Sequence, residues 1–338
     1  MKLTWCGPVA GELKTHMPKY LARRLVYGAV LMLCVIVLNF FLIHAAPGDA
    51  IGALVAESGG GDPAVIAQMR ASYGLDQPLY VQLYKYLGKV ATGDFGRSFH
   101  YDAPVLGVIM ERLPSTLLLT ISALIVAVIV GTALGVIAAL RPRGWRNYFV
   151  TLISLLGYAT PVFWLGMIVL IVFADKFGLF PAYGLTSVPP PETAWALAVD
   201  VLHHLALPVF TLSILFLASY SRISRASTLD VLGSDYIRTA RAKGLLESVV
   251  VLKHALRNAA LPIVTLAGLQ LGHAFSGAVL VEVVFSLPGI GPLLYESIIR
   301  HDYPVMLGVL FGAAFTVVIA NIITDLVYRI LDPRIRLR

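Results

Sequence analysis

Runs of about twenty predominantly apolar residues recur along this sequence, and they limit the folds that it can adopt. A hydrocarbon core about 30 Å thick requires about 20 apolar residues in a helix that crosses it. Because a bilayer offers no water to unpaired backbone groups, such runs are expected to be helical. We therefore predict an all-α polytopic membrane protein with six transmembrane helices. The predicted spans are residues 25–45, 115–140, 148–174, 202–224, 262–285 and 305–328.

Composition agrees with a membrane protein and disfavours a nucleic-acid-binding protein. Charged residues make up 13% of the chain, about half of the roughly 25% usual in soluble domains. The formal net charge of +7 could indicate a nucleic-acid partner. However, 19 of the 26 Lys and Arg residues lie in segments that six spans place on one face: 1–24, 141–147, 222–262 and 329–338. Because positive charge concentrates on the cytoplasmic side, we expect both termini in the cytoplasm and no nucleic-acid partner.

The spans divide the chain into predicted regions. Between the first two spans lies a long amphipathic insertion, which the charge bias places outside the cytoplasm. In it, residues 78–90 have apolar positions at helical spacing, and Pro78 stands near the expected helix start. Pro161 predicts a kink in the third span. The regions are a cytoplasmic segment 1–24, a first span 25–45, an extracytoplasmic insertion 46–114, a membrane core 115–328 and a cytoplasmic tail 329–338.

Motifs that would allow the chain to use ATP or to break a bond by itself are missing. The Gly88-Lys89 pair lacks the upstream Gly and the following hydroxyl of a phosphate-binding loop. His203 and His204 are adjacent, so they do not share a helix face as zinc ligands would. We therefore predict that the chain is not an enzyme and holds no metal. If it transports a solute, the energy comes from a partner or from an ion gradient.

A polar segment at residues 234–262, between the fourth and fifth spans, is the main candidate for a partner contact. Ser234 or Asp235 can cap a helix over 235–243, and Gly244 is well placed just after its end. Late basic residues suit the helix dipole.

A second helix, 246–258, is expected to lead through Leu261-Pro262 into the next span. Tyr236, Ala240 and Gly244 would lie near one face. The segment suits a lever that fits a groove on a neighbour. The alternative is an interfacial helix held by anionic lipid.

An ordered set of motifs resembles the membrane subunits of ABC importers, and more narrowly their dipeptide, oligopeptide and nickel branch. The resemblance covers about residue 20 to the end of the chain. The general pattern has Glu where Arg238 stands, and a shorter spacing from Gly244 to Leu261-Pro262. Both departures are usual in the peptide branch. The motifs are PGD at 47–49, TPVFWLG at 160–166, FGLFP at 177–181, DYIRTARAKG at 235–244, HALRN at 254–258, EVVFSLPGIG at 282–291, DYP at 302–304 and DPR at 332–334.

The resemblance implies a type I ABC importer permease fold in a bacterial inner membrane. The implied partners are a second, homologous but distinct permease subunit, two ATPase subunits that bind ATP and Mg, and an extracytoplasmic binding protein. The chain itself would bind no cofactor. Segment 225–262 would be the cytoplasmic loop that couples to the ATPase, and the insertion 46–114 would help to dock the binding protein. The implied coupling residues are Asp235, Tyr236, Arg238, Ala240, Arg241 and Gly244.

Polar residues inside apolar runs are costly, so they face the bundle or water. Gln270, His273, Glu282 and Asn321 are candidates for a pathway or gate, although hydrogen bonds between helices are the favoured explanation for Gln270 and His273. For Glu282 a structural role at a gate or docking site is favoured over substrate binding.

Asp325 and Arg329 have the spacing of an ion pair. The solute predicted is a di- or oligopeptide, with nickel or another small solute such as a glutathione-like peptide as alternatives. A proton-coupled transporter that uses Asp325 or Glu282 is the rival of another class, and a membrane enzyme is disfavoured.

Overall fold

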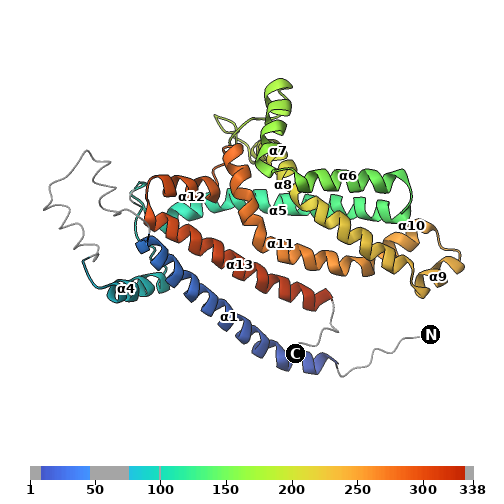
Figure 1. Cartoon of the computed structure of the whole chain (residues 1–338), viewed down its shortest axis with the longest axis horizontal. Coiled ribbons are helices and arrows are strands. Elements are labelled where there is room, and N and C mark those ends of the chain that lie inside the picture. The colour runs from blue at the N-terminus through green and yellow to red at the C-terminus, as the bar shows by residue number, and fades with distance from the viewer. Residues whose placement is uncertain (1–8, 46–75, 99, 332–338) are drawn as a thin grey trace. The chain divides into compact units, whose positions relative to one another are not determined.

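The computed structural model consists mainly of helices (Figure 1). The chain divides into two compact units. The first unit takes residues 1–106 and 301–318, and the second takes 107–300 and 319–338. Among the described residues, β structure is limited to one isolated bridge, between Arg97 and Pro104. The structure describes the backbone of residues 9–45, 76–98 and 100–331, and side chains there except at 9–21, 43, 45, 146, 271–277 and 325–331.

The first unit contains α1 (Val9–Ala45), α4 (Leu79–Ala91) and the beginning of α13 (Tyr303–Leu331). Pro78 stands at the N-cap of α4, so the predicted helix over 78–90 is confirmed. The segment PGD at 47–49 lies outside the described residues.

Polar and aromatic contacts join α4 to α1. The Nε2 atom of His44 lies 3.1 Å from Oε1 of Gln82, and the rings of Phe40 and Tyr86 are 6.0 Å apart. Burial raises the pKa of the Tyr86 hydroxyl to about 12.

Asp302 ties the segment before α5 to the start of α13, also within the first unit. One carboxylate oxygen accepts hydrogen bonds from the Ser98 hydroxyl and from the backbone N–H of His100, the latter at 3.2 Å. The other oxygen lies 3.5 Å from the N–H of Val305, in the first turn of the helix. Asp302 is only 1% exposed, so these donors compensate for the burial of its charge.

The second unit is a helical bundle built around α5, α7, α8 and α11 (Figure 1). Its core includes Leu119 of α5, Leu212 and Tyr220 of α8 and Val281 of α11. Its elements are α5 (Val105–Leu140), α6 (Trp145–Ala159), α7 (Val162–Val169), η1 (Leu170–Lys176), α8 (Ala194–Leu232), α9 (Asp235–Ala242), α10 (Glu247–Val249), η2 (Val250–Ala255), α11 (Leu256–Val284), α12 (Ile290–Ile299) and the end of α13.

Helices α5 and α8 approach each other closely at small residues. A Cβ added to Gly135 would lie 2.5 Å from the backbone oxygen of Ser221. The Ser224 hydroxyl donates to the backbone oxygen of Thr132 at 3.1 Å. Small residues allow such approaches between membrane helices, where packing and hydrogen bonds replace the hydrophobic effect as the force for association.

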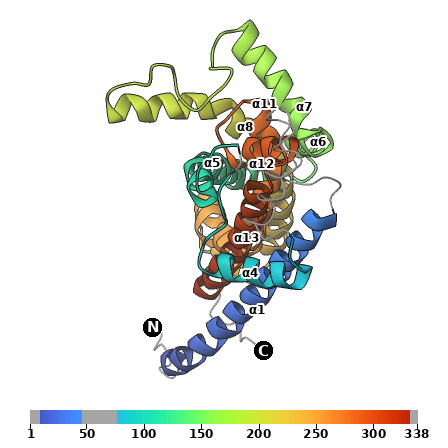
Figure 2. The ribbon, with the colours of Figure 1, turned by 90° about the vertical axis from the view of Figure 1, so that its left-hand side faces the viewer.

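Within the described residues, five helices are long and apolar enough to cross a membrane, or six if the bent pair of α6 and α7 forms one span. The kink expected at Pro161 is in fact a break of 105° (Figure 2). Thr160 and Pro161 both have extended ψ angles, 127° and 129°. Proline disfavours the helical conformation of the residue before it, so α6 ends there and α7 starts in a new direction.

Two other prolines lie inside helices that the sequence led us to divide. Pro262 lies inside α11, and the chain is continuously helical from Glu247 to Val284. The predicted end of the second helix at residue 258, before Leu261-Pro262, is therefore wrong. Pro114 likewise lies inside α5 rather than before it. Neighbouring helices and local adjustments can satisfy the groups that a proline frees, which the local sequence does not reveal.

Candidate functional site

The candidate coupling segment forms a short helix and a sharp turn at one end of the second unit. Helix α9 covers Asp235–Ala242, so the helix predicted over 235–243 is confirmed. Figure 1 places α9 and α10 at the end of this unit opposite α12. Gly244 has a φ angle of +74°, in the left-handed region that favours glycine. The predicted helix-ending role of Gly244 is thus also confirmed.

The beginning of α9 differs from the expectation in one detail. Ser234 occupies the N-cap position with an extended backbone, but its side chain forms no capping bond. Instead, its hydroxyl donates to the backbone oxygen of Val231 at 2.6 Å. Asp235 stands in the first turn, where a negative charge is favourable beside the helix N-terminus.

An apolar cluster attaches α9 to the helical segment that follows. Ile237 and Ala240 point inward and pack with Val250 and Ala255, and all four are buried. Ala240 is only 7% exposed. Because its side chain faces the chain's own core, Ala240 is not part of the exposed side of α9, and the role predicted for it in coupling stays a prediction.

Polar contacts reinforce this attachment. The Tyr236 hydroxyl accepts a hydrogen bond from Nδ2 of Asn258 at 2.7 Å, which links α9 to α11. The Arg241 guanidinium donates to both carboxylate oxygens of Glu247, at 3.1 and 2.6 Å, across the turn that contains Gly244. This hydrogen bond raises the pKa of Arg241. The segment is therefore braced on both sides of the turn.

Exposed side chains cover the outward side of α9 and its turn. Nη1 of Arg238 lies 3.4 Å from Oδ1 of Asp235. Both side chains are exposed to solvent, so this ion pair contributes little to stability. We call the following set the outer α9 surface, since each member is exposed: Asp235, Tyr236, Arg238, Arg241 and Gly244.

The candidate pathway residues occupy different environments. Gln270 is half-buried on α11, and within the described residues its Oε1 atom has no hydrogen-bond partner. Asn321 is exposed on α13. The side chains of His273, Asp325 and Arg329 lie outside the described residues, so the roles suggested for them stay predictions.

Glu282 closes the turn between α11 and α12. Its carboxylate is fully buried and accepts a hydrogen bond from the N–H of Gly291 at 2.7 Å. Thr116 of α5 binds the same turn, because its hydroxyl accepts from the N–H of Ile290 at 2.8 Å. A Cβ at Gly289 would overlap the Glu282 carboxylate. The two glycines therefore make room for the buried carboxyl group.

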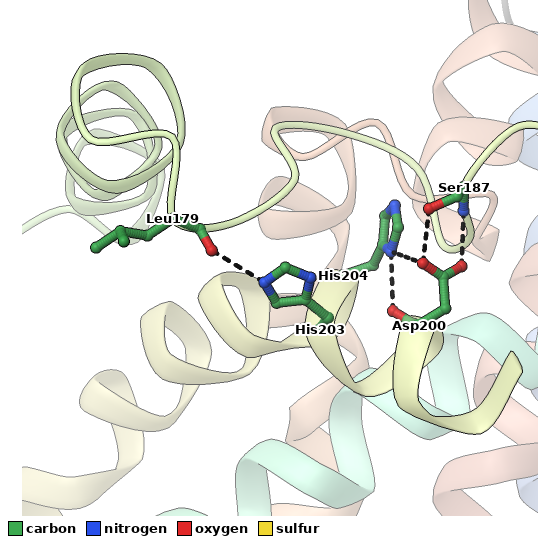
Figure 3. A network of polar contacts seen from close by, with 5 residues as sticks. All are labelled: Leu179, Ser187, Asp200, His203 and His204. Atoms are coloured by element: carbon green, nitrogen blue, oxygen red, sulfur yellow. Dashed lines mark hydrogen bonds and ion pairs between the residues drawn. The ribbon is translucent and has the colours of Figure 1, made fainter. Parts of the chain in front are cut away.

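A second polar network fastens the loop before α8 to that helix (Figure 3). Asp200 accepts hydrogen bonds from the backbone N–H and the hydroxyl of Ser187, at 2.7 and 2.6 Å. Nδ1 of His204 lies 3.4 Å from the Asp200 carboxylate, whereas Nε2 of His203 bonds to the backbone oxygen of Leu179 at 2.9 Å. The two histidines thus point to different partners. In the described part of the chain, no group of three His, Cys, Asp or Glu side chains could hold a metal ion.

Residues 131–337 match the family described as the inner membrane component of binding-protein-dependent transport systems. Residues 17–120 match the N-terminal membrane component of the same systems. The chain belongs to this permease family. It is therefore a multi-pass inner-membrane subunit of an ABC importer rather than an enzyme, and such a system implies an ATPase, a binding protein and a partner permease.

Relatives of this permease span almost its whole length. It is 39% identical to the oligopeptide transport system permease protein AppB of Bacillus subtilis, over 94% of this chain and 99% of that protein. It is 36% identical to the dipeptide transport system permease protein DppB of Alkalihalophilus pseudofirmus, over 95% of this chain and 100% of that protein. It is 38% identical to the glutathione transport system permease protein GsiC of Escherichia coli K12, over 95% of this chain and 99% of that protein.

A solved structure has the same fold. A chain of the methionine ABC transporter MetNI, in an inward-facing conformation, superposes with a TM-score of 0.54. The two sequences are 18% identical, and the match covers 67% of this permease and 97% of that chain. This similarity supports the predicted importer permease fold.

Sequence reasoning missed some residues that shape the coupling segment of the permease. Ile237 is fully buried, and Glu247 accepts two hydrogen bonds from the Arg241 guanidinium. The three-residue spacing of Ile237 and Ala240 could have indicated a shared inward face. The bond between Tyr236 and Asn258 had no local signal, because 22 positions separate the two residues.

Proposed function

We propose that this permease forms the translocation pathway for di- or oligopeptides that an extracytoplasmic binding protein delivers. The observation that carries this proposal is the full-length similarity to permeases named for oligopeptides, dipeptides and glutathione, at 36–39% identity. All three names denote peptides. Transport of nickel or another small solute by the same machinery is the alternative.

The outer α9 surface is the proposed contact with an ATPase subunit. Three features support it: the surface is exposed, it ends in a sharp turn, and the apolar cluster beneath it joins α9 to η2, which continues directly into the long helix α11. A force applied to α9 would therefore be transmitted to α11 rather than lost in a loose loop. Tyr236 and Gly244 are proposed as the decisive contacts. The guanidinium groups of Arg238 and Arg241 already face carboxylates of this chain, whereas the Tyr236 ring stays exposed although its hydroxyl bonds to Asn258, and open space surrounds Gly244.

The proposed assembly contains this permease, a homologous but distinct second permease, two ATPase subunits and the binding protein. Both termini and the coupling segment are placed in the cytoplasm, as the distribution of Lys and Arg favours. The insertion 46–114 is placed outside, where it would help to dock the binding protein. Gln270, His273 and Asn321 are kept as candidate pathway residues, and Glu282 as a structural residue of a gate or docking site.

Reconstituted vesicles test the transported solute and the energy source together. The complete transporter with its binding protein should accumulate a labelled dipeptide when ATP is hydrolysed, and unlabelled peptide should compete with the label. Accumulation of Ni²⁺ without peptide uptake would support the alternative solute. Uptake driven by a proton gradient through this chain alone would contradict an ATP-driven mechanism.

A further inference from the structure

A pocket of about 630 Å³ lies beside the coupling segment, and none of the roles above uses its basic residues. It opens along one side of the helical stretch from η2 to α11. Its lining residues recur at helical spacing, so they share one face of that stretch. Those used below are Lys253, His254, Arg257, Leu261 and Val264.

The two ends of the pocket differ in chemistry. Lys253, His254 and Arg257 lie at the end near α9, whereas Leu261 and Val264 lie farther along the helix. From position 253 to position 264 an α-helix rises by roughly 16 Å. The pocket therefore offers a cationic end followed by an apolar one. Such an arrangement fits a ligand with an anionic head and an apolar tail.

The positive charges at this pocket lack acidic partners. Asp235 and Glu247 are the acidic residues of segment 234–262, and they face Arg238 and Arg241. Among the described residues, none forms an ion pair with Lys253 or Arg257, and the residues that line the pocket include no acid. An external anion would therefore complete the site.

The location favours a lipid as the source of that anion. The fifth predicted span begins at residue 262, and α11 runs into it, so Lys253, His254 and Arg257 stand on the helical stretch just before the membrane, whereas Val264 stands just inside it. Basic pockets beside membrane helices are typical binding sites for anionic headgroups. We propose that this pocket binds an anionic phospholipid, with its phosphate on Lys253, His254 and Arg257 and an acyl chain along Leu261 and Val264.

The site would also make the coupling segment sensitive to lipid. Tyr236 and Asn258, which link α9 to α11 by their hydrogen bond, line the same pocket. A bound headgroup would thus touch both helices at their junction. Anionic lipid is expected to hold α9 against α11 and so to strengthen coupling to the ATPase.

The test uses the complete transporter in nanodiscs of phosphatidylcholine with phosphatidylglycerol, and counts retained phosphatidylglycerol by native mass spectrometry. In the double variant Lys253→Gln/Arg257→Gln, binding should weaken by about 30-fold, because each charge near an anionic surface contributes about fivefold. The matched control is Arg141→Gln/Arg143→Gln, which removes two exposed charges from another loop. The control should retain the lipid.

A second variant and a competitor complete the test. Val264→Trp should lower lipid retention without altering charge, because it fills the apolar end. Inorganic phosphate should not displace phosphatidylglycerol if the acyl chain contributes.

Three results would overturn the proposal. They are equal lipid loss in both double variants, full displacement by phosphate, and loss of ATPase subunits from the Lys253→Gln/Arg257→Gln complex with lipid retention unchanged. The last result would identify the pocket as a protein contact.

Discussion

The Tyr236 hydroxyl and the Asn258 amide form a 2.7 Å hydrogen bond between α9 and α11. It is a direct polar link from the short helix at the end of the bundle to a helix that forms part of its core. Together with the packing of Ile237 and Ala240, it makes α9 an extension of the bundle rather than a free loop. A lever needs this attachment, because movement at one end must reach the other.

Removing that link should weaken coupling more than stability. Tyr236→Phe deletes the hydroxyl and leaves the exposed Asn258 amide free to bind water, so the cost in unfolding free energy should stay near 1 kcal/mol. Peptide transported per ATP hydrolysed should fall. Asn258→Leu should have the same effect. An unchanged transport ratio in both variants would show that the bond does not transmit movement.

Gly244 combines a left-handed backbone with open space around it. A Cβ there would meet no atom within 4 Å, so a large side chain projects outward from the turn. We expect Gly244→Trp to assemble but to hydrolyse ATP without uptake, because the side chain obstructs the partner groove.

Two controls separate bulk from backbone strain at this position. Gly244→Ala adds little bulk and imposes only the cost of a left-handed backbone at a non-glycine residue, about 1–2 kcal/mol. Gly178→Trp places the same side chain at another open glycine with positive φ, at +59°. Both controls should remain coupled. Normal uptake by an assembled Gly244→Trp transporter would refute the contact.

Ala240 and Ala242 allow a matched comparison on one helix. Ala240 is buried in the cluster with Ile237, whereas Ala242 is exposed. Ala240→Leu should overpack the cluster and destabilise the protein by about 1–3 kcal/mol. Ala242→Leu should leave the melting temperature of the purified complex almost unchanged. Equal melting temperatures for the two variants would mean that Ala240 does not face inward.

The turn around Glu282 should not tolerate side chains at its glycines. Gly289 has an ordinary φ of −111°, so the cost of Gly289→Ala is the clash with the buried carboxylate and not backbone strain. We expect a loss of about 1–3 kcal/mol in thermal unfolding of the complex. Gly312→Ala on α13, where a Cβ meets nothing within 4 Å, serves as the control. Destabilisation by Gly312→Ala but not by Gly289→Ala would contradict the close contact between Gly289 and the Glu282 carboxylate.

Cysteine labelling tests the proposed orientation. In a chain with Cys6 and Cys34 replaced by Ser, a cysteine at the exposed Tyr84 should react with an impermeant reagent added outside. A cysteine at the exposed Leu246 should react only after the cytoplasmic side is opened. Reversed labelling would place the coupling segment outside and would exclude its contact with a cytoplasmic ATPase.

Long-range contacts explain where sequence-based reasoning about the site stopped. Gly244 could be assigned because a helix end needs a residue that tolerates positive φ, a local requirement. The inward position of Ala240 depends on Val250 and Ala255, which belong to η2, beyond the turn and α10. The burial of Glu282 depends on a turn that folds back over it and on Thr116 of α5.

Hydropathy alone determined that this chain is an all-helical membrane protein. The length of an apolar run can be read directly from the sequence, and the bilayer thickness sets the length that a spanning helix needs. The ordered motifs likewise pointed to the importer permease family, which the full-length relatives confirm. Only the tertiary structure decided that α6 and α7 part by 105° at Pro161 while α11 continues through Pro262. Both prolines remove the same backbone donor, and the surrounding helices determine whether the chain bends or continues.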